Sequence, residues 1–133
     1  MKKVLAVLLV VCLCSTMFAC ASMSGFEDNL GKDYKKTILT DSDIEDYADL
    51  LDLDMDDYNI KSAIEAKHRT KYTSVVIIEC GSSGKAKSLA KDADEIVDLL
   101  KLTYGSKYSF GIETKGCFVL FGETSAIKDA LGK

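Results

Sequence analysis

Alternating aspartates are the first feature of this chain that could do chemistry. Asp52, Asp54 and Asp56 stand two residues apart, which is the spacing of the first three ligands in an EF-hand calcium loop. That loop also needs glycine at its sixth position and a bidentate glutamate at its twelfth. Counted from Asp52, these positions hold Asp57 and Ala63. The motif is incomplete, so these aspartates are candidates only for weak, screened attraction of a metal ion.

The three aspartates belong to a strongly acidic segment. Residues 41–57 hold nine acidic side chains and no basic one. One hypothesis is therefore a protein that binds a cation or a small ligand through this segment. The alternative is a solvated acidic helix and turn that binds no ion.

Two other patterns fall short of an enzyme motif. Residues 81–85 read Gly-Ser-Ser-Gly-Lys, but a phosphate-binding loop needs glycine where Glu79 stands and serine or threonine where Ala86 stands. We therefore expect a helix cap there, with weak anion binding as the alternative. His68 is the only histidine, and nothing in the sequence places a nucleophile or carboxylate beside it, as general base catalysis requires. The sequence predicts no catalytic residue.

Two cysteines, Cys80 and Cys117, fall at the ends of predicted strands. We expect these strands to be antiparallel neighbours, with both cysteines at the same end. A disulfide then requires Cα atoms within about 4.4–6.8 Å of each other. The alternative is a pair of reduced thiols that pack as small apolar groups.

The N-terminal segment has the three parts of an export signal. Lys2 and Lys3 precede an apolar run over residues 4–13, and the small residue Ala19 precedes Cys20. The apolar run is short for a bilayer core of roughly 30 Å. We therefore expect a cleaved signal peptide rather than a retained membrane helix.

Cys20 directly after Ala19 resembles the lipobox of bacterial lipoproteins. In that family, cleavage makes the cysteine the first residue, and acyl chains such as palmitate are attached to it. Met17 and Phe18 stand where the lipobox usually has an aliphatic and a small residue. The alternative is ordinary secretory cleavage after Ala21, which would release a secreted soluble protein.

The plan of signal, cysteine, polar segment and one small domain is similar to that of small lipoproteins of Gram-positive bacteria with an uncharacterised α+β domain. The resemblance implies an extracytoplasmic protein that is anchored to the membrane through lipid on Cys20. It also implies a non-catalytic binding or structural role at the cell surface, with a protein or cell-wall partner and no cofactor. No catalytic residue is transferred by this resemblance.

Length and charge restrict the domain plan and the partner. Removing residues 1–19 from the 133-residue chain leaves 114 residues, which is enough for one domain. The removal also lowers the formal net charge from −4 to −6, because it takes away Lys2 and Lys3. This charge argues against a nucleic-acid partner, which requires a basic face. We expect a signal peptide over 1–19, an anchor cysteine and flexible tether over 20–40, and a single α+β domain over 41–133.

Hydrophobic periodicity predicts the elements of that domain. We expect helices at about 42–51 and 83–103, strands at 60–68, 72–80, 108–113 and 117–121, and a last short helix. The element order is α-β-β-α-β-β-α, with a four-stranded, mainly antiparallel sheet and helices on one face. We place the strands in the order first, second, fourth, third, as in a ferredoxin-like sheet with a permuted edge strand.

Aromatic residues gather on the second predicted hairpin. They are Tyr108, Phe110, Phe118 and Phe121. Most should line the core, and any that face outward would form a contact surface for a partner.

Overall fold

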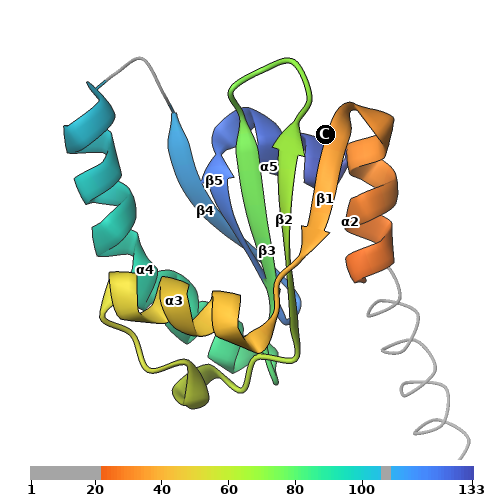
Figure 1. The fold of residues 1–133 in the computed structure, drawn as a ribbon. Helices are drawn as coiled ribbons and strands as arrows, with labels where there is room; N and C mark the ends of the chain where they lie inside the picture. Colours follow the sequence, from red (N-terminus) through yellow and green to blue (C-terminus); the bar gives the residue numbers. More distant parts are fainter. Residues whose placement is uncertain (1–21, 106–108) are drawn as a thin grey trace, which may run out of the picture.

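A sheet of five antiparallel strands forms the centre of the computed structural model, which describes residues 22–105 and 109–133 (Figure 1). The strands are β1 (Tyr34–Ile38), β2 (Ser62–His68), β3 (Ser74–Glu79), β4 (Phe110–Lys115) and β5 (Phe118–Glu123). Their order across the sheet is β1-β2-β3-β5-β4, and every neighbouring pair is antiparallel. β5 therefore lies between β3 and β4, and β1 and β4 form the two edges.

Helices cover both faces of this sheet. α2 (Met23–Leu30) and α5 (Thr124–Leu131) pack on one face. α3 (Asp41–Leu51) crosses the other face, and α4 (Ser83–Tyr104) runs along its side near β4 (Figure 1). Two short 3-10 helices, η1 (Gly31–Asp33) and η2 (Met55–Tyr58), complete the described elements. No helix within residues 22–105 and 109–133 is long and apolar enough to cross a membrane.

The central strands have apolar side chains on both faces, which explains the two helical layers. In β3, Val75 and Ile77 are fully buried against the α2 and α5 layer. Ile78 packs in the second cluster, with residues of α4 and η2. Successive side chains of a strand point to opposite faces, so a continuous apolar run needs cover on both sides.

Short polar side chains begin three of the helices. Ser22 and Ser82 each accept a hydrogen bond from the backbone N–H three residues later, at the starts of α2 and α4. Thr40 and Asp43 form a capping box at α3, in which each side chain accepts from the other residue's backbone N–H, at 3.2 and 2.8 Å. These bonds satisfy N–H groups that have no partner inside a helix.

The predicted flexible tether is wrong for most of residues 20–40. This segment contains α2, η1 and β1, so residues from the N-cap Ser22 onward, and not only those from 41, belong to the folded domain. Phe26, Leu30 and Tyr34 are only 2–4% exposed. Phe26 and Leu30 lie one helical turn apart on α2, and Tyr34 begins β1, so three large side chains fix the segment to the core.

The predicted four-stranded sheet with helices on one face is also wrong. β1 adds a fifth strand beside β2, and the element order becomes α-β-α-β-β-α-β-β-α. The four expected strands keep their relative order as β2, β3, β5 and β4. A single helical layer would have left the second apolar face of β3 and β5 in water, which burial of apolar surface disfavours.

Candidate functional site

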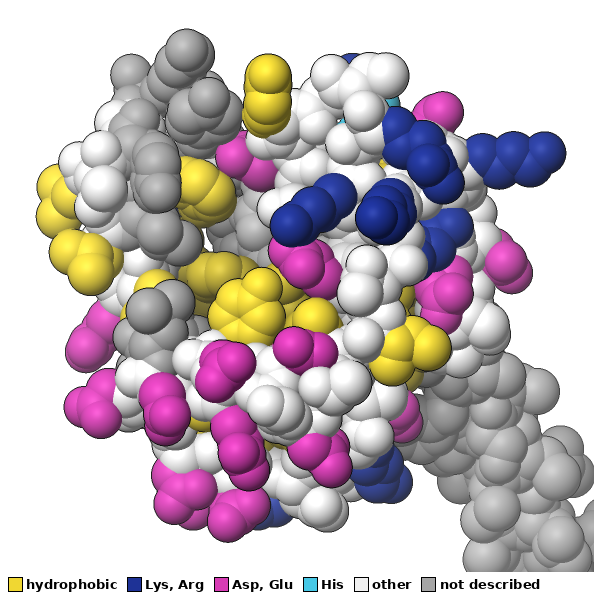
Figure 2. All heavy atoms as spheres, in the orientation of Figure 1, with side chains coloured by type: hydrophobic (Ala, Val, Ile, Leu, Met, Phe, Trp, Pro, Cys, Tyr) yellow, Lys and Arg dark blue, Asp and Glu magenta, His cyan; other side chains and the backbone are white. Residues whose placement is uncertain are grey.

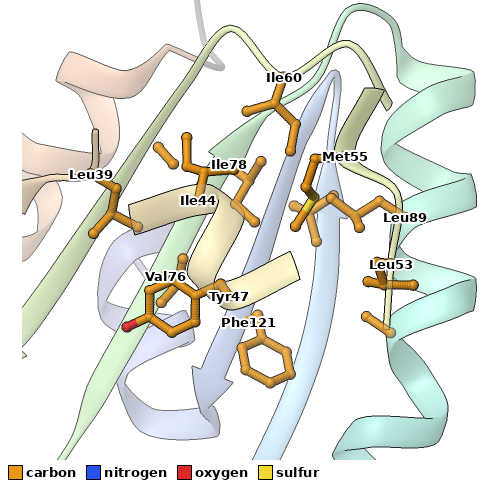
Figure 3. A pocket seen from close by; sticks show the side chains of 13 residues that line it. Leu39, Ile44, Tyr47, Leu53, Met55, Ile60, Val76, Ile78, Leu89 and Phe121 are labelled. Atoms are coloured by element: carbon orange, nitrogen blue, oxygen red, sulfur yellow. The ribbon is translucent and has the colours of Figure 1, made fainter. Parts of the chain in front are cut away.

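An apolar groove opens on the sheet face that α3 crosses (Figure 3). We define it by six side chains that line it, which are Leu39, Ile44, Tyr47, Met55, Val76 and Phe121. All thirteen lining residues are aliphatic, aromatic or methionine, and none carries a charge. The groove encloses a volume of about 60 Å³. Such a surface can bind apolar groups.

The walls of the groove come from elements far apart in the sequence. Val76 of β3 lies opposite Phe121 of β5 in the strand register, and the two form part of the floor. Ile44 and Tyr47 reach the groove from the underside of α3, three residues apart as helix geometry requires. Tyr47 remains 37% exposed, so the groove is open at this side chain.

Two acidic hollows flank the groove, and we call their carboxylates the acidic rims. The acidic rims consist of Asp43, Asp46 and Glu65 in one hollow and of Asp41, Glu45 and Asp56 in the other. No lysine, arginine or histidine lines the groove or either hollow. The nearest ion pair joins Lys67 to Glu65 at 3.3 Å. Figure 2 shows many acidic side chains over the lower part of this face, below a central hydrophobic patch, and most of the visible basic side chains above and to the right of the patch.

Local contacts shift the pKa values of Asp43 and Tyr47 beside the groove. Hydrogen bonds from the backbone and hydroxyl of Thr40 hold the pKa of Asp43 below its usual value, so its carboxylate is ionised at neutral pH. Burial raises the pKa of Tyr47, and the negative charge of Glu65 raises it further. The groove therefore presents a neutral phenol near the ionised carboxylate of Asp43.

The aspartates that resemble a calcium loop do not converge. Asp52 ends α3 in a left-handed conformation with φ of 53°. Asp54 instead caps η2, where its Oδ1 atom accepts from the backbone N–H of Asp56 at 3.1 Å. Among the residues that the structure describes, no three histidine, cysteine or acidic side chains gather as a metal site would require.

Cys80 and Cys117 lie at the same end of neighbouring strands, and both thiols are free. The backbone N–H of Cys80 donates to the carbonyl of Cys117 at 2.8 Å. Burial, with the nearby Cys117 and Glu79 adding to it, raises the pKa of Cys80 to about 11. A thiol with such a pKa is a poor nucleophile at neutral pH. A pair of reduced thiols and a disulfide both stay hypotheses for Cys80 and Cys117.

His68 has a structural role at the end of β2. Its Nδ1 atom accepts from the backbone N–H groups of Thr70 and Lys71, at 3.1 and 3.0 Å. Its ring packs edge-on against Tyr34, with 5.0 Å between the ring centroids. These contacts stabilise the link between β2 and β3 and occupy the nitrogen that a general base would use.

The glycine- and serine-rich segment caps α4, as the sequence predicts. Ser82 accepts from the backbone N–H of Lys85 at 3.2 Å. The ammonium of Lys85 donates to the backbone carbonyl of Asp57 at 2.7 Å. This lysine therefore joins α4 to η2.

The expected anchor cysteine and one expected aromatic lie outside the described residues. Cys20 precedes the first described residue, Ser22, by two positions, and Tyr108 falls between the described ranges. Phe118 is buried in the core, where its ring meets Phe26 edge-on at 5.1 Å. Phe121 lines the groove, so one aromatic of the predicted hairpin belongs to a candidate contact surface.

Sequence reasoning missed the groove as a site. Its only local signal is the pair Ile44 and Tyr47, which stand at helical spacing within a segment that is otherwise acidic. Leu39 and Met55 gave no signal, because isolated apolar residues between predicted elements are common. Comparisons with protein-family models, curated proteins and solved structures find no match to this chain.

Proposed function

We propose that this chain is an exported domain that is anchored to the cell membrane by lipid on Cys20 and has a non-catalytic binding role at the cell surface. The observation that carries the binding role is the apolar groove, because its described lining is aliphatic and aromatic and is open to solvent at Tyr47. Exposed apolar surface rimmed by polar side chains is typical of interaction sites.

The anchoring part of the proposal rests on the sequence before α2. Lys2, Lys3, the apolar run over 4–13 and the Ala19-Cys20 pair form the export and lipidation signal. Because α2 begins at Met23, only two residues separate Cys20 from the first helix. Acyl chains on Cys20 would therefore hold the folded domain directly at the bilayer surface, rather than at the end of a tether.

Cell fractionation tests the anchor. We expect the native chain in the membrane fraction and Cys20→Ser in the medium or periplasm, since a single acyl chain already gives measurable membrane binding and two give stable anchoring. Cys14→Ser is the matched control, because it changes the same residue type within the apolar run of the signal. Equal membrane recovery of the native chain and Cys20→Ser would overturn the anchor.

A further inference from the structure

We propose that the apolar groove binds a cationic amphipathic segment of a partner protein. The segment would place its apolar side on Tyr47, Val76 and Phe121, and its lysine or arginine side chains over the acidic rims. This inference rests on the binding role proposed above and names the chemistry of the partner.

The apolar part of the argument is the incomplete cover that α3 gives to the sheet. Ala48 is the only buried side chain among the α3 side chains that the structure describes, while Ile44 is half-buried. Tyr47 is 37% exposed, and Val76 and Phe121 beneath it are half-buried. An amphipathic helix that lays its apolar side chains into a groove buries surface of this kind.

The second part of the argument is charge. Six carboxylates form the acidic rims on the two sides of the groove, and the lining of all three hollows contains no basic residue. Among the described residues, Glu65 is the rim carboxylate that forms an ion pair, with Lys67 at 3.3 Å. Figure 2 shows the acidic side chains grouped below the central hydrophobic patch. Complementary charge speeds encounter and selects a partner, so the rims favour a segment rich in lysine or arginine.

The size of the groove and the charge of its rims argue against a small molecule, an anionic lipid or a second copy of the chain as the occupant. A small-molecule site usually has a volume of roughly 300–1,000 Å³, and the groove encloses about 60 Å³. Fatty acids and anionic lipids would bring negative charge against the rims. In a symmetric dimer the same patch meets itself, so two copies would place one set of acidic rims against the other.

The first test uses two synthetic helices as probes. Each has about 18 residues, or five helical turns, with leucine at helical spacing and either lysine or glutamate at the remaining positions. Binding is measured by fluorescence anisotropy of labelled peptide against the full protein as recovered from cells, in phosphatidylcholine nanodiscs if it is acylated. We expect the leucine–lysine peptide to bind at least about tenfold more tightly, with an affinity that falls as salt rises.

Matched variants locate the binding site. Tyr47→Ala should weaken binding of the leucine–lysine peptide roughly tenfold, as for a contact aromatic. Tyr72→Ala, which makes the same change at a side chain 93% exposed in the β2–β3 link, should leave it unchanged. Asp46→Lys should weaken binding about fivefold, and Asp28→Lys on α2 should not, because Asp28 lies outside the acidic rims.

Two results would overturn the inference. They are equal binding of the two peptides, and equal loss of binding in Tyr47→Ala and Tyr72→Ala. The result for peptide binding can be distinguished from the result for the lipid anchor. Peptide binding by a protein that carries no acyl chain would overturn the anchor alone, and an acylated, folded protein that ignores the peptide would overturn this inference alone.

Discussion

The hydroxyl of Tyr58 donates a 2.6 Å hydrogen bond to the carboxylate of Asp92, which joins η2 to α4. Tyr58 is 5% exposed, and it packs with Cys80, Ala86 and Leu89 in the second core cluster. Met55 of the same η2 and Leu89 of α4 line the apolar groove. This bond, together with that from Lys85 to the carbonyl of Asp57, therefore holds two walls of the groove together.

Loss of this bond should measurably destabilise the protein. Tyr58→Phe keeps the ring and removes the donor, and we expect the free energy of unfolding to fall by about 1.5–3 kcal/mol, as for a hydrogen bond to a charged group. Urea unfolding measures the change. Tyr72→Phe is the control, and an equal midpoint for Tyr58→Phe and the native protein would contradict this role.

Two buried tyrosines should make the fold sensitive to alkaline pH. Burial, and hydrogen bonds to Asp129 and Asp92, raise the pKa of Tyr34 and of Tyr58 from 10.0 to about 12. Between these values the unfolded chain has released the protons that the folded chain still holds, so stability falls as pH rises from 10 towards 12. Melting temperatures across this range should fall less steeply for the double variant Tyr34→Phe/Tyr58→Phe. Parallel profiles for the two proteins would contradict the assignment.

Gly122 should tolerate no side chain. Its φ is 149°, and an added Cβ would lie 2.3 Å from the carbonyl oxygen of Ser74 and 2.9 Å from the Cα of Val75. We expect Gly122→Ala to lower the free energy of unfolding by at least about 2 kcal/mol, through backbone strain and overlap. Gly111 is the matched control, because it pairs with Gly122 in the register of β4 and β5 and an added Cβ there meets only ordinary contacts. Equal stability of the two alanine variants would contradict this account.

The two cysteines of the domain should differ in reactivity. Cys80 is 1% exposed with its pKa raised to about 11, whereas Cys117 is half-buried. We expect a thiol reagent to modify Cys117 in the folded protein and Cys80 only after unfolding. Mass spectrometry of peptides prepared without reductant measures the modification of each cysteine and keeps any disulfide intact. Failure of both cysteines to react after unfolding would instead establish the alternative of a disulfide between them.

Calcium should not stabilise the fold. A ligand that binds only the folded state raises the melting temperature, but Asp52, Asp54 and Asp56 form no common site in the part of the chain that is described. We expect equal melting temperatures in millimolar calcium and millimolar magnesium. A rise specific to calcium that Asp54→Asn abolishes would revive the cation-binding hypothesis.

Repeating patterns allowed part of the fold to be predicted from the sequence. The apolar stripe of α4 includes Ala86, Leu89, Ala93 and Val97, and all four side chains are buried. The predicted bounds of 83–103 are close to the observed Ser83–Tyr104, because Ser82 and Gly105 mark its ends in the sequence. The strand β3 was similarly clear from its β-branched residues.

The missed elements have weak local patterns. β1 is an edge strand with adjacent lysines, Lys35 and Lys36, and charged residues are common on edge strands because they oppose aggregation. The groove could not be predicted, because Tyr47 and Phe121 meet only after α3 crosses the sheet. The acidic residues were evident from composition alone, but their place beside the groove depends on tertiary structure.

The most direct test of the anchored binding domain is the intact mass of the protein recovered from cell membranes. Our account predicts a chain that starts at Cys20, is heavier by its acyl chains, and is absent from membranes in Cys20→Ser. A chain without acyl groups that starts at Ser22 and is found in the medium would contradict the account, and would make this a secreted soluble protein.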